Sequence, residues 1–569
     1  MKTVNEPYCF HIFADTAEAG RAADILVREL NARAAAARTE TREGADIALL
    51  TDPAICRDGY RIEDDFKSTS LIASGIRGHI FAIGMLLRKL EKGGCGVRLG
   101  DIAGSYAPDK RIRGHQIGYR TTPNTYDAWS YEDYRRYYLD MMFFGVNTVE
   151  HIPYEKGVSN RNSLMQYDEE EFLVEAARIA DEYDLDVYVW HPIERCRAIS
   201  NELKRSHPNA EMWPSAQQPH SIPAWGEDLI KELEKLPDEI DGIITGPNRA
   251  FEIDELRRRL PAKYPIRLYP DITHNVRCEY PVHFDRDDWH FALATGLSRE
   301  CTNPRPREYR RIHRLTRRYV VGSVSYSEGV NDDVNKFVWS DMDYFPDCDL
   351  RTTLLDYSRL FFFGAPADTI ADGILALELN WQCDPAENPT IDSTLETFER
   401  LRREYPFLNE NWRFLQLLMR AECDKLLRSR RLFELELIRS ARRAAFDGEL
   451  EDVREFLELE PGEEYLELRA DISRIAQRLF RLIGMQLDVE HYGADSWERG
   501  AILETIDLPV TDREWLLGRL DHAMVDDDPV EYMRRAFDRN RVDSDEYYFS
   551  VALNGLAECG CRQSGEVYM

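Results

Sequence analysis

A regular alternation of strand-like and helix-like segments, beginning at Arg111, is the feature that most constrains the fold. The strand-like segments are short and apolar, as expected for strands buried on both faces of a parallel sheet. The better-marked ones cover residues 113–120, 146–152, 187–190, 242–245, 266–269 and 320–326. Helix-like segments follow at 130–144, 169–183, 227–236 and 252–260. Strand–helix units of this number and length predict an α/β fold, a (β/α)₈ TIM barrel over residues 111–385.

Two strands of the predicted barrel are poorly marked. The sixth is expected somewhere in residues 289–297. Residues 358–363 fit either the end of a helix or the eighth strand, and the sequence leaves both open. The barrel prediction therefore rests on the other six strands.

The regions before and after the predicted barrel have different patterns of apolar and charged residues. Residues 1–110 predict a small α/β domain, with strands at 8–14 and 46–50 and helices at 17–37 and 78–90. Residues 386–569 predict a mostly helical domain, because long periodic segments with interleaved arginine and glutamate are typical of helices with solvated faces. These segments are 393–403, 411–428, 432–446, 450–457 and 464–482.

Charge and composition exclude several classes of protein. The chain has 73 basic and 103 acidic residues among 569, a formal net charge of −30. Such a field opposes binding to nucleic acid and to anionic membrane surfaces. No segment approaches the ~20 apolar residues of a membrane span, and the start of the sequence lacks a signal-peptide pattern. The eleven scattered cysteines argue against a disulfide framework, so we expect a cytoplasmic protein.

The strand at 320–326 ends in a group of acids that points to function. It is followed by Glu328, Asn331, Asp332 and Asp333 around a glycine. Parallel barrels present catalytic groups at the carboxyl ends of their strands, and we expect this role for Glu328. Asp332 and Asp333 are expected to begin the next helix, where acids are favoured.

The predicted strand ends place polar and aromatic side chains around one barrel mouth. Carboxylates, amides and histidines bind hydroxyl groups, and aromatic rings stack on the apolar faces of a pyranose, so the set fits a sugar site. The expected substrate-binding residues are Arg113, His115, Gln116, Tyr119, Glu150, His151, Trp190, His191, Asn248, Arg249, His274, Asn275, Tyr326 and Asn331. Further aromatic residues in the same loops include Tyr126, Trp129, Tyr269 and Trp289.

Glycoside hydrolysis usually needs two carboxyl groups, one protonated and one ionised. Glu328 and Asp271 are the first candidates for this pair, and Glu194 is the next. Each also has a structural interpretation. Asp271 follows a proline and could cap a turn, and Glu194 could form a local ion pair with Arg195.

A metal site is the competing explanation for clustered histidines and acids. His191 and Glu194 lie three residues apart, as do Asp271 and His274, but this spacing is common by chance. No HExxH motif or CxxC pair accompanies them, and no dinucleotide or phosphate-binding loop is present. We therefore predict no metal and no cofactor, and keep a metal-dependent lyase or isomerase as an alternative.

Several short motifs resemble a known group of enzymes. The stretch at 60–62 and 71–78, followed by a helix, is similar to the small α/β domain that precedes the barrel in α-glucuronidases of glycoside hydrolase family 67 and in β-N-acetylhexosaminidases of family 20. Arg113-Gly114 resembles the Arg-Gly strand that opens those barrels. YPDITHN (269–275), NPRP (303–306) and YSEGVNDDVNK (326–336) resemble motifs of bacterial proteins related to these enzymes.

The resemblance implies a glycosidase fold with a helical domain after the barrel, but it transfers no catalytic residue. Hexosaminidases carry an adjacent Asp-Glu pair after the fourth strand, whereas residues 245–249 here read TGPNR. The general acid of the α-glucuronidases has no residue-by-residue match either. The family pattern therefore leaves the catalytic residues of this chain open.

Together, these features predict a hydrolase that acts on the end of an oligosaccharide and releases a uronic acid or an N-acetylhexosamine. Arg113, Arg249 and Arg277 are candidates to neutralise a sugar carboxylate. A non-catalytic carbohydrate-binding barrel is the other alternative, because the acid pair after the fourth strand is missing. The helical domain could mediate a homodimer.

Overall fold

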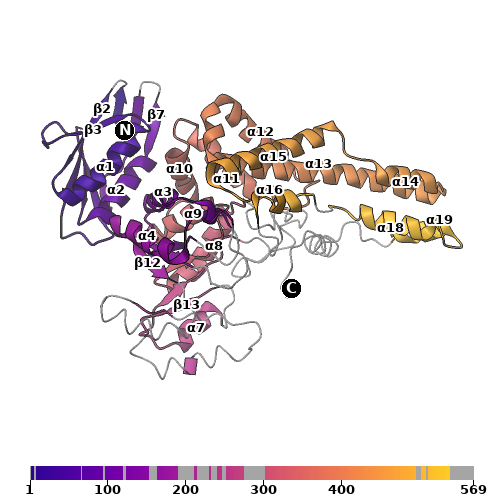
Figure 1. Cartoon of the computed structure of the whole chain (residues 1–569), viewed down its shortest axis with the longest axis horizontal. Helices are drawn as coiled ribbons and strands as arrows, with labels where there is room; N and C mark the ends of the chain where they lie inside the picture. Colours follow the sequence, from indigo (N-terminus) through magenta and orange to yellow (C-terminus); the bar gives the residue numbers. More distant parts are fainter. Residues whose placement is uncertain are drawn as a thin grey trace.

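The computed structural model describes three consecutive parts of the chain (Figure 1). The described residues are 2–5, 8–65, 67–93, 96–118, 124–152, 163–189, 211–213, 230–231, 240–246, 251–273, 302–494, 502–507 and 510–538. An N-terminal α/β domain lies on one side of a parallel sheet, and long helices extend away on the other side. The order of these parts agrees with the sequence analysis, while the domain limits at 110 and 385 stay predictions.

The N-terminal domain is built on a six-stranded sheet of order β3-β2-β4-β6-β5-β9. Its strands are β2 (Cys9–Ala14), β3 (Ala35–Arg38), β4 (Ile47–Thr51), β5 (Tyr60–Asp64), β6 (Thr69–Ala73) and β9 (Gly104–Tyr106). Helices α1 (Ala17–Asn31) and α2 (Ile76–Arg88) pack on it through buried aliphatic side chains. A small antiparallel sheet adds β1 (Lys2–Asn5), β7 (Leu90–Gly93) and β8 (Gly96–Leu99).

The helix predicted at 17–37 is wrong in its last part. It ends at Asn31, and the alanine-rich segment after it forms β3, which pairs in parallel with β2. Helix propensity is a weak preference, and the free edge of β2 outweighs it here.

The second sheet is entirely parallel, in the order β12-β11-β10-β15-β14-β13. Its strands are β10 (Ile112–Gln116), β11 (Thr148–His151), β12 (Asp186–Val189), β13 (Ile243–Thr245), β14 (Ile266–Leu268) and β15 (Gly322–Ser325). The last strand, β15, pairs with the first strand, β10, so the chain order runs around the sheet as it does in a barrel. The structure thus shows a curled parallel half-barrel, and β12 and β13 are its edges.

The two poorly marked strands have different outcomes: for residues 358–363 the helix-end alternative is confirmed, and the sixth strand stays a prediction. The segment 358–363 is not a strand, because residues 350–361 form helix α10 (Leu350–Phe361), and β15 already occupies the place beside β10. The predicted sixth strand at 289–297 lies outside the described residues. Since β14 pairs directly with β15, no strand separates these two.

Helices cover the outside of this sheet. They are α3 (Tyr131–Met142), α4 (Glu169–Glu182), α7 (Ile253–Arg259), α8 (Pro306–Thr316) and α9 (Asp333–Tyr344), with short 3-10 turns η1 (Thr125–Ala128) and η3 (Arg317–Tyr319). Helix α9 begins at Asp333, so the prediction that Asp332 and Asp333 start a helix is confirmed. On the opposite, inner side, Ile112 and Val324 pack with Tyr188 and Ile244.

The described residues after α10 are mostly helical, as predicted. They contain α11 (Ala367–Leu379), α12 (Thr390–Glu404), η4 (Pro406–Glu410), α13 (Trp412–Asp447), α14 (Leu450–Glu458), α15 (Glu463–Ile483), α16 (Val489–Tyr492), α17 (Ile502–Thr505), α18 (Arg513–Ala523) and α19 (Pro529–Asp538). The two helices predicted at 411–428 and 432–446 are one continuous helix, α13, since no residue between them interrupts the backbone ladder. The far end of α13 forms a separate apolar core with α14, α18 and α19 (Figure 1).

Over the part of the chain that the structure describes, no helix is both long enough and apolar enough to cross a bilayer.

Candidate functional site

Three buried polar side chains lie on the inner side of the half-barrel. Glu150 accepts hydrogen bonds from Gln116 Nε2 at 2.7 Å and from Arg267 Nη2 at 2.5 Å. Gln116 stands opposite Glu150 in the register of β10 and β11, whereas Arg267 reaches across from β14. The Arg267 side chain is 1% exposed and also lies over the Tyr188 ring, 4.7 Å from its centroid. The ion pair between Arg267 and Glu150 places two charges that neutralise each other on the inner side of the sheet.

Two partly exposed tyrosines follow this buried group toward the carboxyl ends of the strands. Tyr269 comes directly after β14, and its hydroxyl donates a hydrogen bond to Gln116 Oε1 at 2.9 Å. Tyr326 comes directly after β15, and the two rings meet edge to face with centroids 5.7 Å apart. Partly exposed rings at this edge offer the kind of surface on which a sugar ring can stack.

Asp271 and Glu328 extend the same two neighbouring strands. Asp271 forms a parallel bridge with Tyr326, and its Oδ1 accepts a hydrogen bond from the Thr273 backbone amide at 3.0 Å. Glu328 lies two residues beyond Tyr326, and its backbone amide donates to Thr273 Oγ1 at 3.3 Å. Their exposed fractions are 8% and 3%. The structure therefore brings the two predicted catalytic carboxylates to one edge of the sheet.

The loop that carries Glu328 is held from below by a buried cluster. The Tyr126 hydroxyl donates to the Gly329 carbonyl at 2.8 Å, and Lys336 Nζ donates to the same oxygen at 3.0 Å. Lys336 also pairs with Asp332, which accepts the hydroxyl proton of Thr273. Burial alone would lower the pKa of Lys336, but the Asp332 carboxylate outweighs it and raises that pKa. The Lys336–Asp332 pair thus supports the loop that carries Glu328.

The helical region fixes the helix that follows this loop. Arg413 of α13 donates to Asp333 Oδ2 at 2.9 Å and to Asp140 Oδ2 at 3.1 Å. The hydroxyls of Tyr137 and Tyr357 also donate to Asp333, at 2.9 and 2.6 Å. The acidic N-terminus of α9 is thus tied to three other helices, so the helical region contributes to the rigidity of the site.

A second anchor of the helical region lies on the loop after β10. The Gln486 amide donates to the Asn124 carbonyl at 2.9 Å, and the Trp129 indole donates to the Ile483 carbonyl at 3.1 Å. Tyr126, which holds the Glu328 loop, lies in this same segment.

Three of the predicted substrate-binding residues point away from the inner side of the sheet. Arg113 donates to Asp58, Gly145 and Lys110 in the contact with the N-terminal domain. His115 lies between the hydroxyls of Ser325 and Ser340, at 2.6 Å from each. His151 contacts the Tyr138 hydroxyl and the Ile117 carbonyl. All three are buried, and burial lowers the pKa of His115 well below its usual value, so this ring is neutral.

The other predicted residues divide into two groups. Gln116, Glu150, Tyr326, Asn331, Asp271 and Glu328 lie along the inner side or the carboxyl edge of the sheet, and Asn331 is buried in the loop after Glu328. The remainder lie outside the described residues: Tyr119, Trp190, His191, Glu194, Asn248, Arg249, His274, Asn275 and Arg277.

Sequence reasoning missed Arg267, Thr273 and Lys336. Arg267 could have been found, because an arginine inside an otherwise apolar strand needs a buried partner. Thr273 carries no such signal, since its partners are remote in the sequence. Lys336 could have been found as the partner of Asp332, which lies four residues earlier.

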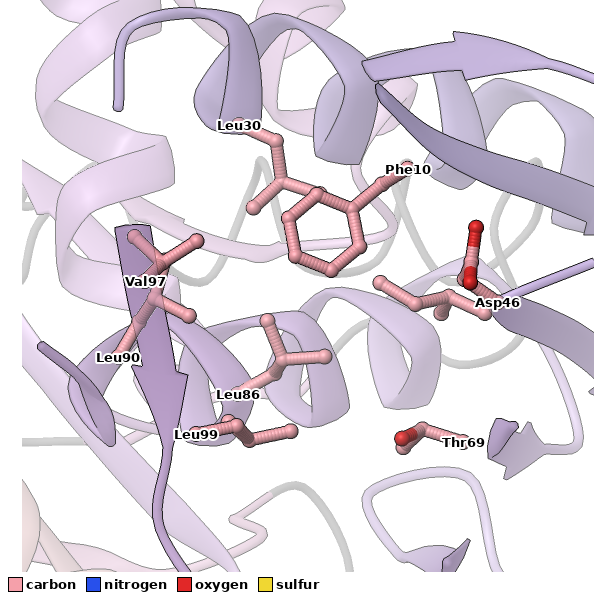
Figure 2. A pocket seen from close by; sticks show the side chains of 9 residues that line it. Phe10, Leu30, Asp46, Thr69, Leu86, Leu90, Val97 and Leu99 are labelled. Carbon is pink, nitrogen blue, oxygen red and sulfur yellow. The ribbon is translucent and has the colours of Figure 1, made fainter. Parts of the chain in front are cut away.

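No metal centre emerges from the described residues. Among them, no group of three or more histidine, cysteine, aspartate and glutamate side chains could hold a metal ion. A cavity of about 20 Å³ lies in the N-terminal domain, between Phe10, Leu30, Leu86 and Leu99 (Figure 2). It has room for about one water molecule and is too small for a sugar.

The comparison with solved structures finds a similar fold in a glycoside hydrolase. A GH138 enzyme targeting pectin rhamnogalacturonan II matches over 94% of this chain and 81% of its own, with a TM-score of 0.51 and 11% sequence identity. This likeness confirms, at the level of the fold, the resemblance to glycoside hydrolases that the sequence motifs predicted.

Two further solved structures show weaker similarity. A family GH115 4-O-methyl-α-glucuronidase with specificity for decorated arabinogalactans matches over 85% of this chain and 78% of its own, with a TM-score of 0.49 and 10% identity. The GH20 β-N-acetylhexosaminidase from Streptomyces coelicolor matches over 65% and 93%, with a TM-score of 0.44 and 11% identity. No protein-family model and no curated protein sequence matches the chain.

Proposed function

We propose that the chain is a glycoside hydrolase that acts on the end of an oligosaccharide through a two-carboxylate acid/base mechanism. The observation that carries the proposal is the position of Asp271 and Glu328, each three residues beyond the end of the neighbouring strands β14 and β15. The carboxyl ends of parallel barrel strands are where catalytic groups lie in enzymes with this architecture. The likeness to a glycoside hydrolase fold supports the same class of reaction.

In this mechanism, one carboxyl group protonates the departing oxygen, and the other acts as base or nucleophile. Glu328 or Asp271 is the acid, and the other takes the second role. Glu194 is kept as a third candidate. The separation of the two carboxyl groups sets the stereochemistry, with about 5 Å for retention and about 6.5–9.5 Å for inversion.

The sugar is bound by the inner polar group and the two tyrosines. Gln116, Glu150, Tyr326 and Asn331 stay in the proposed binding site because they lie on the inner side or at the carboxyl edge. Arg113, His115 and His151 are assigned instead to the packing between the sheet and its surroundings. A uronic acid or an N-acetylhexosamine is the proposed terminal sugar that the enzyme releases.

Four finer features complete the proposal. The half-barrel belongs to a closed (β/α)₈ barrel, in which any further strand has its place between the edge strands β12 and β13. The chain is cytoplasmic, binds no nucleic acid, and could form a homodimer through its helical region. These features rest on the sequence analysis.

The test is turnover of a panel of aryl glycosides and uronide-tipped oligosaccharides by the wild type and by Glu328→Gln. We expect hydrolysis by the wild type and a loss of about 10³-fold or more in kcat for the variant, since the acid or nucleophile is removed while the shape is kept. Equal melting temperatures would show that both proteins are folded. Wild-type turnover that Glu328→Gln and Asp271→Asn leave intact would contradict the assignment of the two carboxylates.

A substrate panel without any turnover would contradict the hydrolase itself. If sugars nevertheless raise the melting temperature, the carbohydrate-binding alternative gains support.

A further inference from the structure

The four inner side chains form one hydrogen-bonded chain with a fixed direction. It runs from Arg267 through Glu150 and Gln116 to Tyr269, with donor–acceptor distances of 2.5, 2.7 and 2.9 Å. The first three residues are buried, and Tyr269 is the member that keeps exposed surface. The chain therefore connects a buried charge to the carboxyl edge of the sheet.

The direction of every bond follows from the chemistry of the buried end. An arginine can only donate hydrogen bonds, and an ionised carboxylate can only accept them. Glu150 therefore takes N–H groups from both neighbours, and the Gln116 amide must turn its Nε2 toward Glu150. Its Oε1 then faces Tyr269, whose hydroxyl has to donate.

This arrangement uses the single proton of the Tyr269 hydroxyl. Any other group that meets the hydroxyl oxygen must supply a hydrogen of its own. We propose that Arg267, Glu150 and Gln116 are positioning residues that make Tyr269 a hydrogen-bond acceptor for one hydroxyl group of the bound sugar. This proposal rests on the proposed function, because it takes the carboxyl edge to be the place where the sugar binds.

The proposal predicts that a change at Glu150 reverses the chain. In Glu150→Gln, the new amide has to turn its oxygen toward Arg267 and its NH₂ toward Gln116. The Gln116 amide then presents its oxygen to residue 150 and its Nε2 to Tyr269, whose proton is released toward the sugar. A substitution two hydrogen bonds away from Tyr269 thus converts the Tyr269 acceptor into a donor.

Fluorinated sugars report whether Tyr269 accepts or donates, because fluorine replaces a hydroxyl at similar size but supplies no hydrogen. The probes are para-nitrophenyl β-N-acetylglucosaminide and α-glucuronide, each with its single deoxyfluoro derivatives at every free hydroxyl. For the wild type, we expect kcat/KM to fall by about tenfold or more at one position, where the donor to Tyr269 is lost.

Two variants test whether the sensitive hydroxyl of the sugar is the one that donates to Tyr269. In Tyr269→Phe, the parent glycoside should slow to the rate of its deoxyfluoro derivative, so the difference vanishes. In Glu150→Gln, the derivative should instead speed up relative to the parent, so the difference vanishes or reverses. Tyr138→Phe is the matched control, since it removes a buried hydroxyl from the outer side of the sheet and should leave the difference unchanged.

The hydrogen-bonded chain from Arg267 through Glu150 and Gln116 to Tyr269 acts as a relay, and the outcomes distinguish a failure of this relay from a failure of the proposed function. Turnover with no sensitive position, or with a sensitivity that neither Tyr269→Phe nor Glu150→Gln alters, overturns the relay and leaves the hydrolase standing. If no glycoside is turned over, the same sugars are compared as ligands by titration calorimetry, and the same pattern is expected in Kd. Absence of any binding would overturn the relay together with the proposed function.

Discussion

Neighbouring residues of β10 and β11 point to opposite sides of one sheet and meet different surroundings. On the inner side, Gln116 and Glu150 connect the buried Arg267 to Tyr269, which is partly exposed. On the outer side, Arg113 and His151 contact backbone carbonyls and side chains of the covering elements. Both sets are buried and hydrogen-bonded, so burial and polarity alone do not distinguish a binding group from a packing group. The side of the sheet does.

Replacement of Arg113 should have the largest effect on stability and no effect on the reaction. Arg113→Leu removes the guanidinium from Asp58 and from two carbonyls, and leaves buried acceptors without their donor. We expect the free energy of unfolding to fall by about 3–5 kcal/mol, as for other broken buried ion pairs. Denaturant unfolding measures the loss. A changed KM in the folded variant would place Arg113 in the binding site after all.

The corresponding change on the inner side should affect both properties. Arg267→Leu leaves the buried Glu150 without its cation, and we expect a loss of about 3 kcal/mol in unfolding free energy. Because the direction of the hydrogen bonds to Tyr269 is then no longer fixed, KM should rise as well. Steady-state kinetics on the folded protein tests this. If Arg267→Leu and Arg113→Leu change only stability, the two sides do not differ in function.

The pH dependence of stability should show the lowered pKa of the buried His115. Burial holds the pKa of His115 well below the usual value of 6.5, so the unfolded chain binds a proton there that the folded chain does not. The sign follows directly: stability falls as the pH drops below about 6.5, by at most ~1.4 kcal/mol per pH unit for one site.

His115→Gln tests this prediction. It should flatten that part of the curve of unfolding free energy against pH and leave the pH dependence of kcat/KM unchanged. An unaltered stability curve would contradict a buried neutral histidine, and an altered kinetic profile would contradict its place on the outer side.

Loss of a single outer hydroxyl should have the smallest effect. Tyr138→Phe removes the hydrogen bond of 2.9 Å to His151 Nε2. We expect a decrease of about 1 kcal/mol in unfolding free energy, the usual contribution of one buried hydrogen bond. The melting temperature and kcat/KM, measured together, check this. A large kinetic effect would show that His151 acts on the sugar as first predicted.

Much of the candidate site could be predicted because it follows local rules. A carboxylate after a buried strand marks the edge where the strand ends, and this placed Asp271 and Glu328 without knowledge of the fold. Arg267 was missed because its partner, Glu150, lies 117 residues earlier in the chain. His115 was taken for a sugar ligand because a strand sequence does not show which of its two faces is the inner one.

The sequence by itself determined the alternation of strands and helices, the helical end of the chain and the acids at the strand ends. These depend on the periodicity of apolar residues and on caps and turns, which act over a few residues. Only the tertiary structure decided that β15 lies between β10 and β14, that residues 358–361 end a helix, and that Arg267 meets Glu150. The physical reason is that strand order and buried charge pairs are set by contacts between distant segments, whose free energy no local pattern contains.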